Sequence, residues 1–352
     1  MKKVTFKNYL VSGIGPGPSG VGRLMQNLIF IYSEKNYKFI YKKNEISLSL
    51  LRSKKKYFTL FFELILRIID DLFFKLRLFF IKNKRIILIH PQSIGYKTTF
   101  NLLKYNNIFL YIVDNSFFCI RSYNVHPADN SECLHCLKSL QPLDSCRPEP
   151  VMYFKKFNIK YLEYLKLNSS RITFLAQNKN QKKLLIKHFG ENLKVRVVGM
   201  NTNDFNDDKK FSKNGKQYDI VFHGKSLIPK GIIYVLNLAH QLPQFTFLIP
   251  DLFSNVQKIY ARKIPHNVSC HEMSWETGLK DLVINARLVL NPSLWSAPIE
   301  GALLKSAYYN SNVGTVISEY GYESETNIIR NHLRLSSDIT IASEQVINYF
   351  NN

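Results

Sequence analysis

A repeated strand–helix pattern between residues 218 and 319 constrains the fold of this chain more than any other feature. Apolar, β-rich runs alternate there with segments of helical periodicity; the runs are 218–224, 245–250, 268–273 and 288–293. Strands separated by helices in this way form βαβ units and pair into a parallel sheet. Ligands bind such sheets beyond the carboxyl ends of the strands. The residues that follow each run are therefore the first candidates for a functional site.

The amino-terminal half alternates in the same manner. Residues 4–11 are predicted to form a strand that leads into a glycine-rich turn and a helix, and further strands are expected at 37–41, 85–90, 108–113, 171–177 and 195–198. At 352 residues, the chain is long enough for two cores of ordinary size. We predict an α/β protein with two Rossmann-like parallel-sheet domains that face a cleft, at residues 1–200 and 218–352. The polar, aperiodic segment 201–217 is the predicted linker.

Two lysines lie where the first strand of the second half is expected to end. Lys225 follows Gly224, and Lys230 precedes Gly231 at the start of a predicted helix. Ammonium groups in this position can stabilise the charge on a diphosphate leaving group without a metal ion. In so basic a chain, a pair of lysines can also be plain solvated surface. Their place at a strand end beside glycines favours the binding role.

A second set of candidates follows the strand at 288–293. Ser296 is predicted to cap a helix whose first turn contains Pro298 and Glu300. Such a helix start also presents amides that bind phosphate, so capping and binding are compatible. Glu300 either contacts a ligand or only complements the helix dipole.

The amino-terminal domain offers a glycine loop and two strand-end side chains. Gly20 and Gly22 lie in a glycine-rich turn where backbone amides can approach an anion at a helix start; the alternative is a merely flexible turn. Asp114 ends a predicted strand, where it either orients or deprotonates an acceptor hydroxyl or caps the following turn. His90 ends another strand and is a weaker candidate.

These segments resemble the motifs of GT-B glycosyltransferases, in particular the retaining group known as glycosyl transferases group 1 (family 4). That group reads Gly-Arg-x4-Lys-Gly where this chain has 224–231, and Pro-Ser-x3-Glu-x7-Glu-Ala where it has 292–306. The glycine loop at 18–23 is similar to the group's amino-terminal loop. Residues 112–114 are similar to its His-Asp segment near the acceptor, with Val113 in place of the histidine. In the resembled fold, the closing helix, here predicted at 343–350, packs back across the cleft.

The resemblance implies metal-independent transfer of a sugar, with retention, from a nucleotide-sugar donor to a glycan or lipid-linked acceptor. Surface polysaccharide or lipopolysaccharide assembly is the implied setting. Asp114 and Glu300 take the catalytic positions, and the donor-binding positions are Gly20, Gly22, Lys225, Lys230, Ser296, Pro298 and Lys305. The group's two motif glutamates fall on Ala297 and Lys305, and Glu300 lies one helical turn from Ala297. The alternative is therefore a non-catalytic GT-B protein that binds a sugar nucleotide or a partner.

Four of the five cysteines fall within a proline-containing segment and are candidate zinc ligands: Cys119, Cys133, Cys136 and Cys146. The C-x2-C pair has zinc-knuckle spacing, and two further thiols can complete a tetrahedral site. His126 and His135 are reserve ligands. A structural zinc, unligated thiols and a disulfide all remain open, and no cofactor is expected for catalysis.

The formal charge of +22 bears on partners and location. Such a surface attracts nucleotide diphosphates, anionic lipids or nucleic acid, although an AT-rich genome also explains it. No nucleic-acid-binding motif is present, so that partner is not expected. Residues 57–82 form an aromatic segment that gathers its charges on one side; it is either a crossover helix buried on the sheet or a helix in a membrane interface. Since no secretory signal or spanning stretch is expected, we predict a cytoplasmic protein with peripheral contact to the inner face of an anionic plasma membrane.

Overall fold

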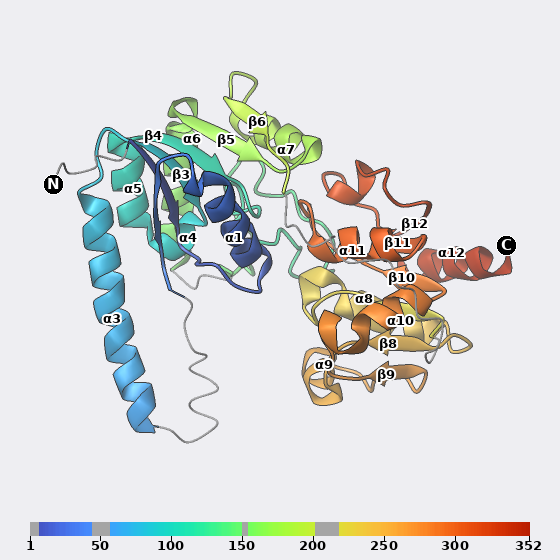
Figure 1. Cartoon of the computed structure of the whole chain (residues 1–352). Helices are drawn as coiled ribbons and strands as arrows, with labels where there is room; N and C mark the ends of the chain where they lie inside the picture. Colours follow the sequence, from blue (N-terminus) through green and yellow to red (C-terminus); the bar gives the residue numbers. More distant parts are fainter. Residues whose placement is uncertain (1–6, 44–56, 150–153, 201–217) are drawn as a thin grey trace.

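The computed structural model describes residues 7–43, 57–149, 154–200 and 218–352. Within these ranges the chain forms two α/β domains that lie side by side (Figure 1). The predicted linker 201–217 and the first part of the predicted strand 4–11 lie outside the described residues. The domain bounds therefore stay a prediction.

The amino-terminal domain is built on a six-stranded parallel sheet with the order β2-β1-β3-β4-β5-β6. Its strands are β1 Asn8–Ser12, β2 Tyr37–Tyr41, β3 Arg85–Ile89, β4 Asn107–Tyr111, β5 Ile172–Ala176 and β6 Val195–Val197. Buried apolar runs explain the central strands, since helices cover both faces of a parallel sheet. The helices are α1 Gly20–Ser33, α3 Tyr57–Phe79, α4 Pro91–Ile94, α5 Tyr96–Tyr105, α6 Lys155–Leu167 and α7 Lys179–Phe189, with a 3-10 turn η1 at Ser169–Arg171.

The carboxyl-terminal domain has a second six-stranded parallel sheet, with the order β12-β11-β10-β7-β8-β9. The four predicted strands are confirmed as β7 Ile220–Phe222, β8 Phe247–Ile249, β9 Val268–Cys270 and β10 Leu288–Leu290. Two strands that the sequence did not indicate, β11 Asn312–Val316 and β12 Asn331–Leu335, complete the sheet. The helices are α8 Ile232–Gln241, α9 Phe253–Ile259, α10 Lys280–Asn285, α11 Gly301–Tyr309 and α12 Ile339–Asn351, with short turns η2 Ile228–Lys230, η3 Trp275–Leu279 and η4 Tyr322–Ser324.

The closing helix does not pack back on the amino-terminal domain, so that prediction was wrong. Helix α12 contacts α8 and β12 of its own domain, and Figure 1 places it at the end remote from the other domain. Ala342 and Val346 are fully buried in the core of the carboxyl-terminal domain, and the tilted rings of Phe350 and Phe245 pack with their centroids 4.6 Å apart. The apolar face of α12 is used up in contacts with its own domain and is not available to the amino-terminal domain.

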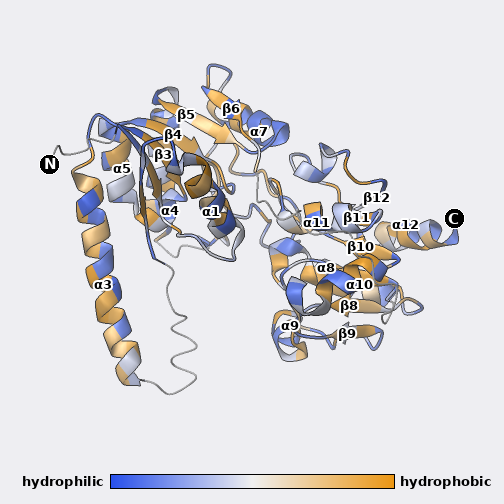
Figure 2. Ribbon diagram, in the orientation of Figure 1, coloured by the Kyte–Doolittle hydropathy of each residue, from blue (hydrophilic) through white to orange (hydrophobic). Residues whose placement is uncertain are grey.

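Helix α3 is also not the buried crossover helix that one alternative predicted. Of its side chains, only Phe74 and Leu78 are buried, and the helix projects along the side of the domain with hydrophobic residues over much of its length (Figure 2). In the part of the chain that the structure describes, no helix is long and apolar enough to cross a membrane.

Candidate active site

The carboxyl edge of the amino-terminal sheet brings His90 and Asp114 together. Asp114 Oδ2 lies 3.9 Å from His90 Nε2, and the same carboxylate accepts hydrogen bonds from Gln92 Nε2 at 3.4 Å and from the Ser116 amide at 3.0 Å. His90 has a left-handed backbone with a φ of 50°, an uncommon conformation that occurs at functional sites. Burial lowers the pKa of His90, although Asp114 opposes the shift, so its ring is neutral at pH 7. The pair therefore joins a carboxylate to a neutral imidazole at the strand ends.

The glycine loop opens α1 as the sequence predicted. Ser19 caps the helix by accepting a 3.0 Å hydrogen bond from the Gly22 amide. Gly22 packs so closely on Gly17 that a Cβ would lie 2.6 Å from the Gly17 oxygen, whereas nothing lies within 4 Å of a Cβ on Gly20. The two glycines therefore differ. A side chain at position 22 would collide with Gly17, whereas a side chain at position 20 would enter open space at the start of the helix.

In the carboxyl-terminal domain, Lys230 contacts Glu300 because two loops pack tightly. Gly231 has a φ of +82°, and a Cβ there would lie 2.2 Å from the Pro292 oxygen. The Leu294 amide donates a 3.0 Å hydrogen bond to the Pro229 carbonyl, which fixes the loop after β10 to the loop after β7. The Lys230 ammonium forms an ion pair with Glu300 in this arrangement.

The ammonium of Lys230 is partly enclosed by aromatic rings. It lies 5.0 Å from the ring centroid of Trp295 and 5.5 Å from that of Tyr123. Burial lowers the pKa of Lys230 to about 7, and the charge of Lys225 adds to this shift; the carboxylate of Glu300 acts in the opposite direction. Lys225 itself is exposed at the end of β7. The two predicted lysines are therefore close enough for the charge of one to affect the other.

The predicted helix start at Ser296 was wrong. Helix α11 begins at Gly301, with Glu300 as its cap residue, and the Glu300 carboxylate makes no capping bond. Pro298 explains the delay, because proline disfavours a helical conformation in the residue before it. Glu300 consequently does not complement a helix dipole from inside the first turn. It accepts a hydrogen bond from the Ser293 hydroxyl and pairs with Lys230.

Lys305 lies inside α11 and is 7% exposed. Its ammonium lies 4.8 Å from the ring centroid of Trp275, which is stacked on His223 at 5.2 Å. Burial, with the charge of Lys305 as a second cause, lowers the pKa of His223 to about 3. His223 Nδ1 and the Ser306 hydroxyl share a 2.8 Å hydrogen bond. Lys305 therefore belongs to a packed aromatic cluster beside the end of β7.

Two glutamates that the sequence did not single out connect the domains. Glu132 accepts hydrogen bonds from the Glu319 amide at 2.6 Å and from the Ser296 hydroxyl. Glu325 accepts from the amides of Lys179 and Asn180 at 2.9 and 2.8 Å, at the amino terminus of α7. A carboxylate there is favoured by the helix dipole. Nothing local in the sequence marks either residue, because each contact joins distant parts of the chain.

Ser296 also forms hydrogen bonds between the two domains. Its amide donates a 3.1 Å hydrogen bond to Asn124, whose side-chain amide donates to the Ser296 hydroxyl at 2.9 Å. Asn115 donates to the Ser296 carbonyl at 3.0 Å. Ser296 is 3% exposed, so its polar groups are engaged by the loop that follows β4.

The four clustered cysteines are free thiols on that loop. Cys119, Cys136 and Cys146 are buried in the core of the amino-terminal domain, and Cys133 is half-buried. A hydrogen bond with Cys136, followed by burial, raises the pKa of Cys119. His126 instead pairs with Asp129 at 3.2 Å. Among the described residues, no group of three or more His, Cys, Asp or Glu side chains is placed to hold a metal ion. Structural zinc therefore stays a prediction, which metal analysis of the purified protein tests.

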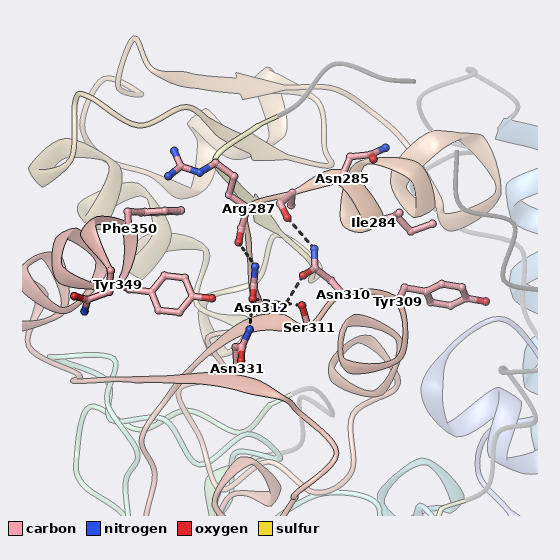
Figure 3. A pocket seen from close by; sticks show the side chains of 12 residues that line it. Ile284, Asn285, Arg287, Tyr309, Asn310, Ser311, Asn312, Asn331, Tyr349 and Phe350 are labelled. Atoms are coloured by element: carbon pink, nitrogen blue, oxygen red, sulfur yellow. Dashed lines mark hydrogen bonds between the residues drawn. The ribbon is translucent and has the colours of Figure 1, made fainter. Parts of the chain in front are cut away.

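A further hollow lies at the opposite edge of the carboxyl-terminal sheet, where β10, β11 and β12 begin (Figure 3). Asn310 donates to the carbonyls of Val283 and Ala286 at 2.7 and 2.9 Å, and Asn312 donates to the Arg287 carbonyl at 3.0 Å. These side-chain amides already donate to backbone carbonyls near the starts of β10 and β11. We therefore do not propose this hollow as a binding or catalytic site.

Comparisons with known proteins identify the architecture. No protein-family model matches the chain, and no curated protein matches its sequence. Its structure is similar to sucrose-phosphate synthase from Thermosynechococcus elongatus, with a TM-score of 0.60 and 10% identity over 98% of this chain and 90% of that chain. The chain has the GT-B fold. It is also similar to Anabaena HepE, solved with UDP-glucose, at a TM-score of 0.56 and 12% identity over 97% and 89% of the two chains.

A third similar structure is the lipopolysaccharide outer core galactosyltransferase WaaB, with a TM-score of 0.55 and 13% identity over 97% of this chain and 90% of that chain. At these identities, the likeness establishes the GT-B fold alone. It agrees with the two parallel sheets; His90 and Asp114 follow strands of the first sheet, and Lys225 and Lys230 follow β7 of the second.

Proposed function

We propose that the protein is a glycosyltransferase that moves a sugar from a nucleotide-sugar to an acceptor held by the amino-terminal domain. The main support is the placing of Lys225, Lys230 and Glu300 at strand ends of one GT-B domain, opposite Asp114 at a strand end of the other. Open α/β sheets bind ligands at these ends. The similar structures include a UDP-glucose complex and a galactosyltransferase, which makes a UDP-sugar the first donor to test.

In the proposed reaction, an acceptor hydroxyl attacks the anomeric carbon of the donor sugar on the face from which the diphosphate leaves, so the configuration is retained. The bond from that carbon to the diphosphate oxygen breaks, and its electron pair leaves with the nucleoside diphosphate. Lys225 and Lys230 stabilise the charge that develops on this leaving group, so no metal ion is required. Asp114 orients the acceptor hydroxyl and takes its proton. Glu300 accepts hydrogen bonds from donor-sugar hydroxyls.

The finer features follow from the resemblance in sequence: retention at the anomeric carbon, a glycan or lipid-linked acceptor, and a role in surface polysaccharide or lipopolysaccharide assembly. In the resembled group the glycine loop contributes to the donor site, so we assign Gly20 and Gly22, at the start of α1, to donor binding.

A thermal-shift screen with UDP-, GDP-, ADP- and CMP-sugars tests the donor, because a ligand that binds the native state raises the melting temperature. The stabilising donor is then supplied with its sugar labelled, with and without EDTA, and free sugar and transferred sugar are measured. Turnover that persists in EDTA supports metal-independent transfer. No stabilisation by any of the donors would contradict the proposal.

One observation favours the second candidate, a non-catalytic GT-B protein that binds a sugar nucleotide. Glu300 is already neutralised by Lys230, and the positions of the resembled group's glutamates hold Ala297 and Lys305. A pure binding protein would be stabilised by the donor without hydrolysing it or transferring its sugar. The same labelled-donor assay therefore separates the two functions.

A further inference from the structure

Helix α3 holds Glu63, Arg67 and Asp71 against the protein and turns most of its apolar side chains toward solvent. Glu63 and Arg67 are joined at 3.1 Å with side chains only 20% and 18% exposed, and Asp71 pairs with Lys42 of the segment after β2 at 2.6 Å. The outward face is formed by Phe58, Phe61, Phe62, Ile65, Ile68, Ile69, Leu72, Phe73, Leu76 and Phe79, all of which are exposed. A helix on the surface of a soluble protein normally has the opposite arrangement.

This outward face is continuous and long. A projection at 100° per residue gives an arc of apolar side chains from Ile68 to Phe73 without a single charged residue. Phe58, Ile68 and Leu72 are 78%, 69% and 65% exposed. The 23 residues of α3 span about 35 Å at roughly 1.5 Å per residue. Soluble proteins rarely expose an apolar patch of this extent unless it binds something.

Each acidic side chain of α3 has a basic side chain beside it. The acidic groups therefore do not repel an anionic partner strongly. Besides the two pairs above, Asp71 contacts Lys75, and Asp70 lies 3.9 Å from Lys43. The exposed cations Lys82, Arg85 and Lys104 follow close to the end of α3 and carry no acidic partner in the described structure. The helix therefore offers an apolar face bordered by positive charge.

Charge decides which partner fits this surface. A second copy of the chain would bring another +22 to the same place, so helix-to-helix pairing is opposed by repulsion. A bilayer with anionic headgroups supplies both an apolar interior for the aromatic side chains and negative charge for the flanking cations. We infer that α3 lies in the headgroup region of an anionic membrane, with its outward face toward the acyl chains. This inference does not depend on the donor, the acceptor or catalysis.

Flotation with lipid vesicles tests the inference on the full chain. Vesicles of phosphatidylcholine with an equal part of phosphatidylglycerol should carry the protein upward, and vesicles of phosphatidylcholine alone should carry at least tenfold less. Raised salt should reduce binding, since it screens the charge attraction. The variant Phe58→Gln/Phe61→Gln/Leu72→Gln should bind the anionic vesicles at least tenfold more weakly.

A matched control removes equally exposed apolar side chains elsewhere: Leu167→Gln/Phe253→Gln/Ile341→Gln should bind the vesicles as the native protein does. Circular dichroism checks that both variants are folded. As a second readout, Phe61→Trp adds an indole to a chain whose two tryptophans, Trp275 and Trp295, lie in the other domain. Brominated lipids should quench the added emission only.

The inference is overturned if the native protein ignores anionic vesicles, or if the α3 variant and its control lose binding equally. Light scattering, which measures the molar mass in solution, tests the alternative that a second copy of the chain covers this face. A dimer that the α3 variant converts to monomer, without vesicle binding by the native protein, would assign the face to a second copy of the chain.

Discussion

Lys230 and Glu300 form an ion pair although they come from different loops, one after β7 and one after β10. The close packing of Gly231 on Pro292 holds the loops together. The pair places a positive and a negative group side by side near the carboxyl ends of β7 and β10, the edge at which open α/β sheets bind ligands. In our proposal, an entering diphosphate takes over the ammonium, which frees the carboxylate for sugar hydroxyls.

If both lysines bind a diphosphate, changing them together to alanine should weaken binding of a nucleoside diphosphate at least tenfold and leave nucleoside binding nearly unchanged. Each lost charge-assisted hydrogen bond accounts for about 1.5–3 kcal/mol. Calorimetric titration of Lys225→Ala/Lys230→Ala measures both affinities. Lys258→Ala/Lys263→Ala, which removes the same charge from exposed sites of that domain, is the control. Equal loss of both ligands would exclude a phosphate role.

The pKa of Lys230 near 7 predicts that donor affinity falls above neutral pH. Below pH 7 the ammonium is already protonated in the free protein, so affinity is constant there. A bound diphosphate raises the pKa, and binding above pH 7 must therefore take up a proton. The dissociation constant of the nucleotide-sugar should then rise by up to about tenfold per pH unit. In Lys230→Ala, binding should be weaker and the dissociation constant should not change with pH. That result would assign the pH dependence of the native protein to Lys230.

Glu300→Gln should preserve the fold and reduce sugar transfer about tenfold or more. The carboxylate is expected to accept charge-assisted hydrogen bonds from the donor sugar, and about 1.4 kcal/mol corresponds to a factor of ten. Transfer kinetics with the donor found in the screen measure the effect, with the exposed Glu344→Gln as control. Unchanged kinetics would reduce Glu300 to a partner of Lys230, and donor recognition would then rest on backbone amides and the lysines. Lys305→Glu need not improve transfer, since Lys305 is packed under Trp275.

Local patterns predicted all strands of the first sheet and four of the second, because a buried parallel strand is an apolar run that needs no knowledge of its neighbours. They failed at β11, whose sequence NVGTV contains asparagine, glycine and threonine, and at β12, whose sequence NHLRL is mostly polar and lies at the sheet edge. They also failed at α11. Serine and proline suggested a helix start there, but Ser296 is held by Asn124 of the other domain and the helix begins after the proline.

The candidate site divides in the same way. Lys225, Lys230 and Asp114 could be placed after strand ends, because strand ends of a parallel sheet are predictable positions. The contacts of Glu132 could not be predicted, since they join it to Glu319 in the opposite domain. For α3, the projection separated polar from apolar faces, but only the tertiary structure reveals that Glu63 and Arg67 face the protein.

Gly231→Ala should destabilise the protein strongly, by more than about 1 kcal/mol, and should also disturb the cleft. The residue has a positive φ, and a Cβ would collide with the Pro292 carbonyl. Gly20→Ala is the matched control, because open space surrounds that position at the start of α1. Chemical denaturation of both variants compares their free energies of unfolding. Equal values would mean that the packing of the two loops contributes little.

The contacts of Glu132 and Glu325 predict that the two domains unfold together. Glu325 accepts two backbone hydrogen bonds from the start of α7, and Glu132 holds the segment that follows β11. Glu132→Gln/Glu325→Gln replaces these charge-assisted bonds by neutral ones, which are roughly half as strong. Scanning calorimetry should then resolve two transitions where the native protein has one, and small-angle scattering should give a larger radius of gyration. The exposed pair Glu191→Gln/Glu344→Gln controls for the lost charge and should behave as the native protein. A single transition at an unchanged temperature in the Glu132/Glu325 variant would mean that these bonds do not couple the domains, and that the two domains are held together by other contacts.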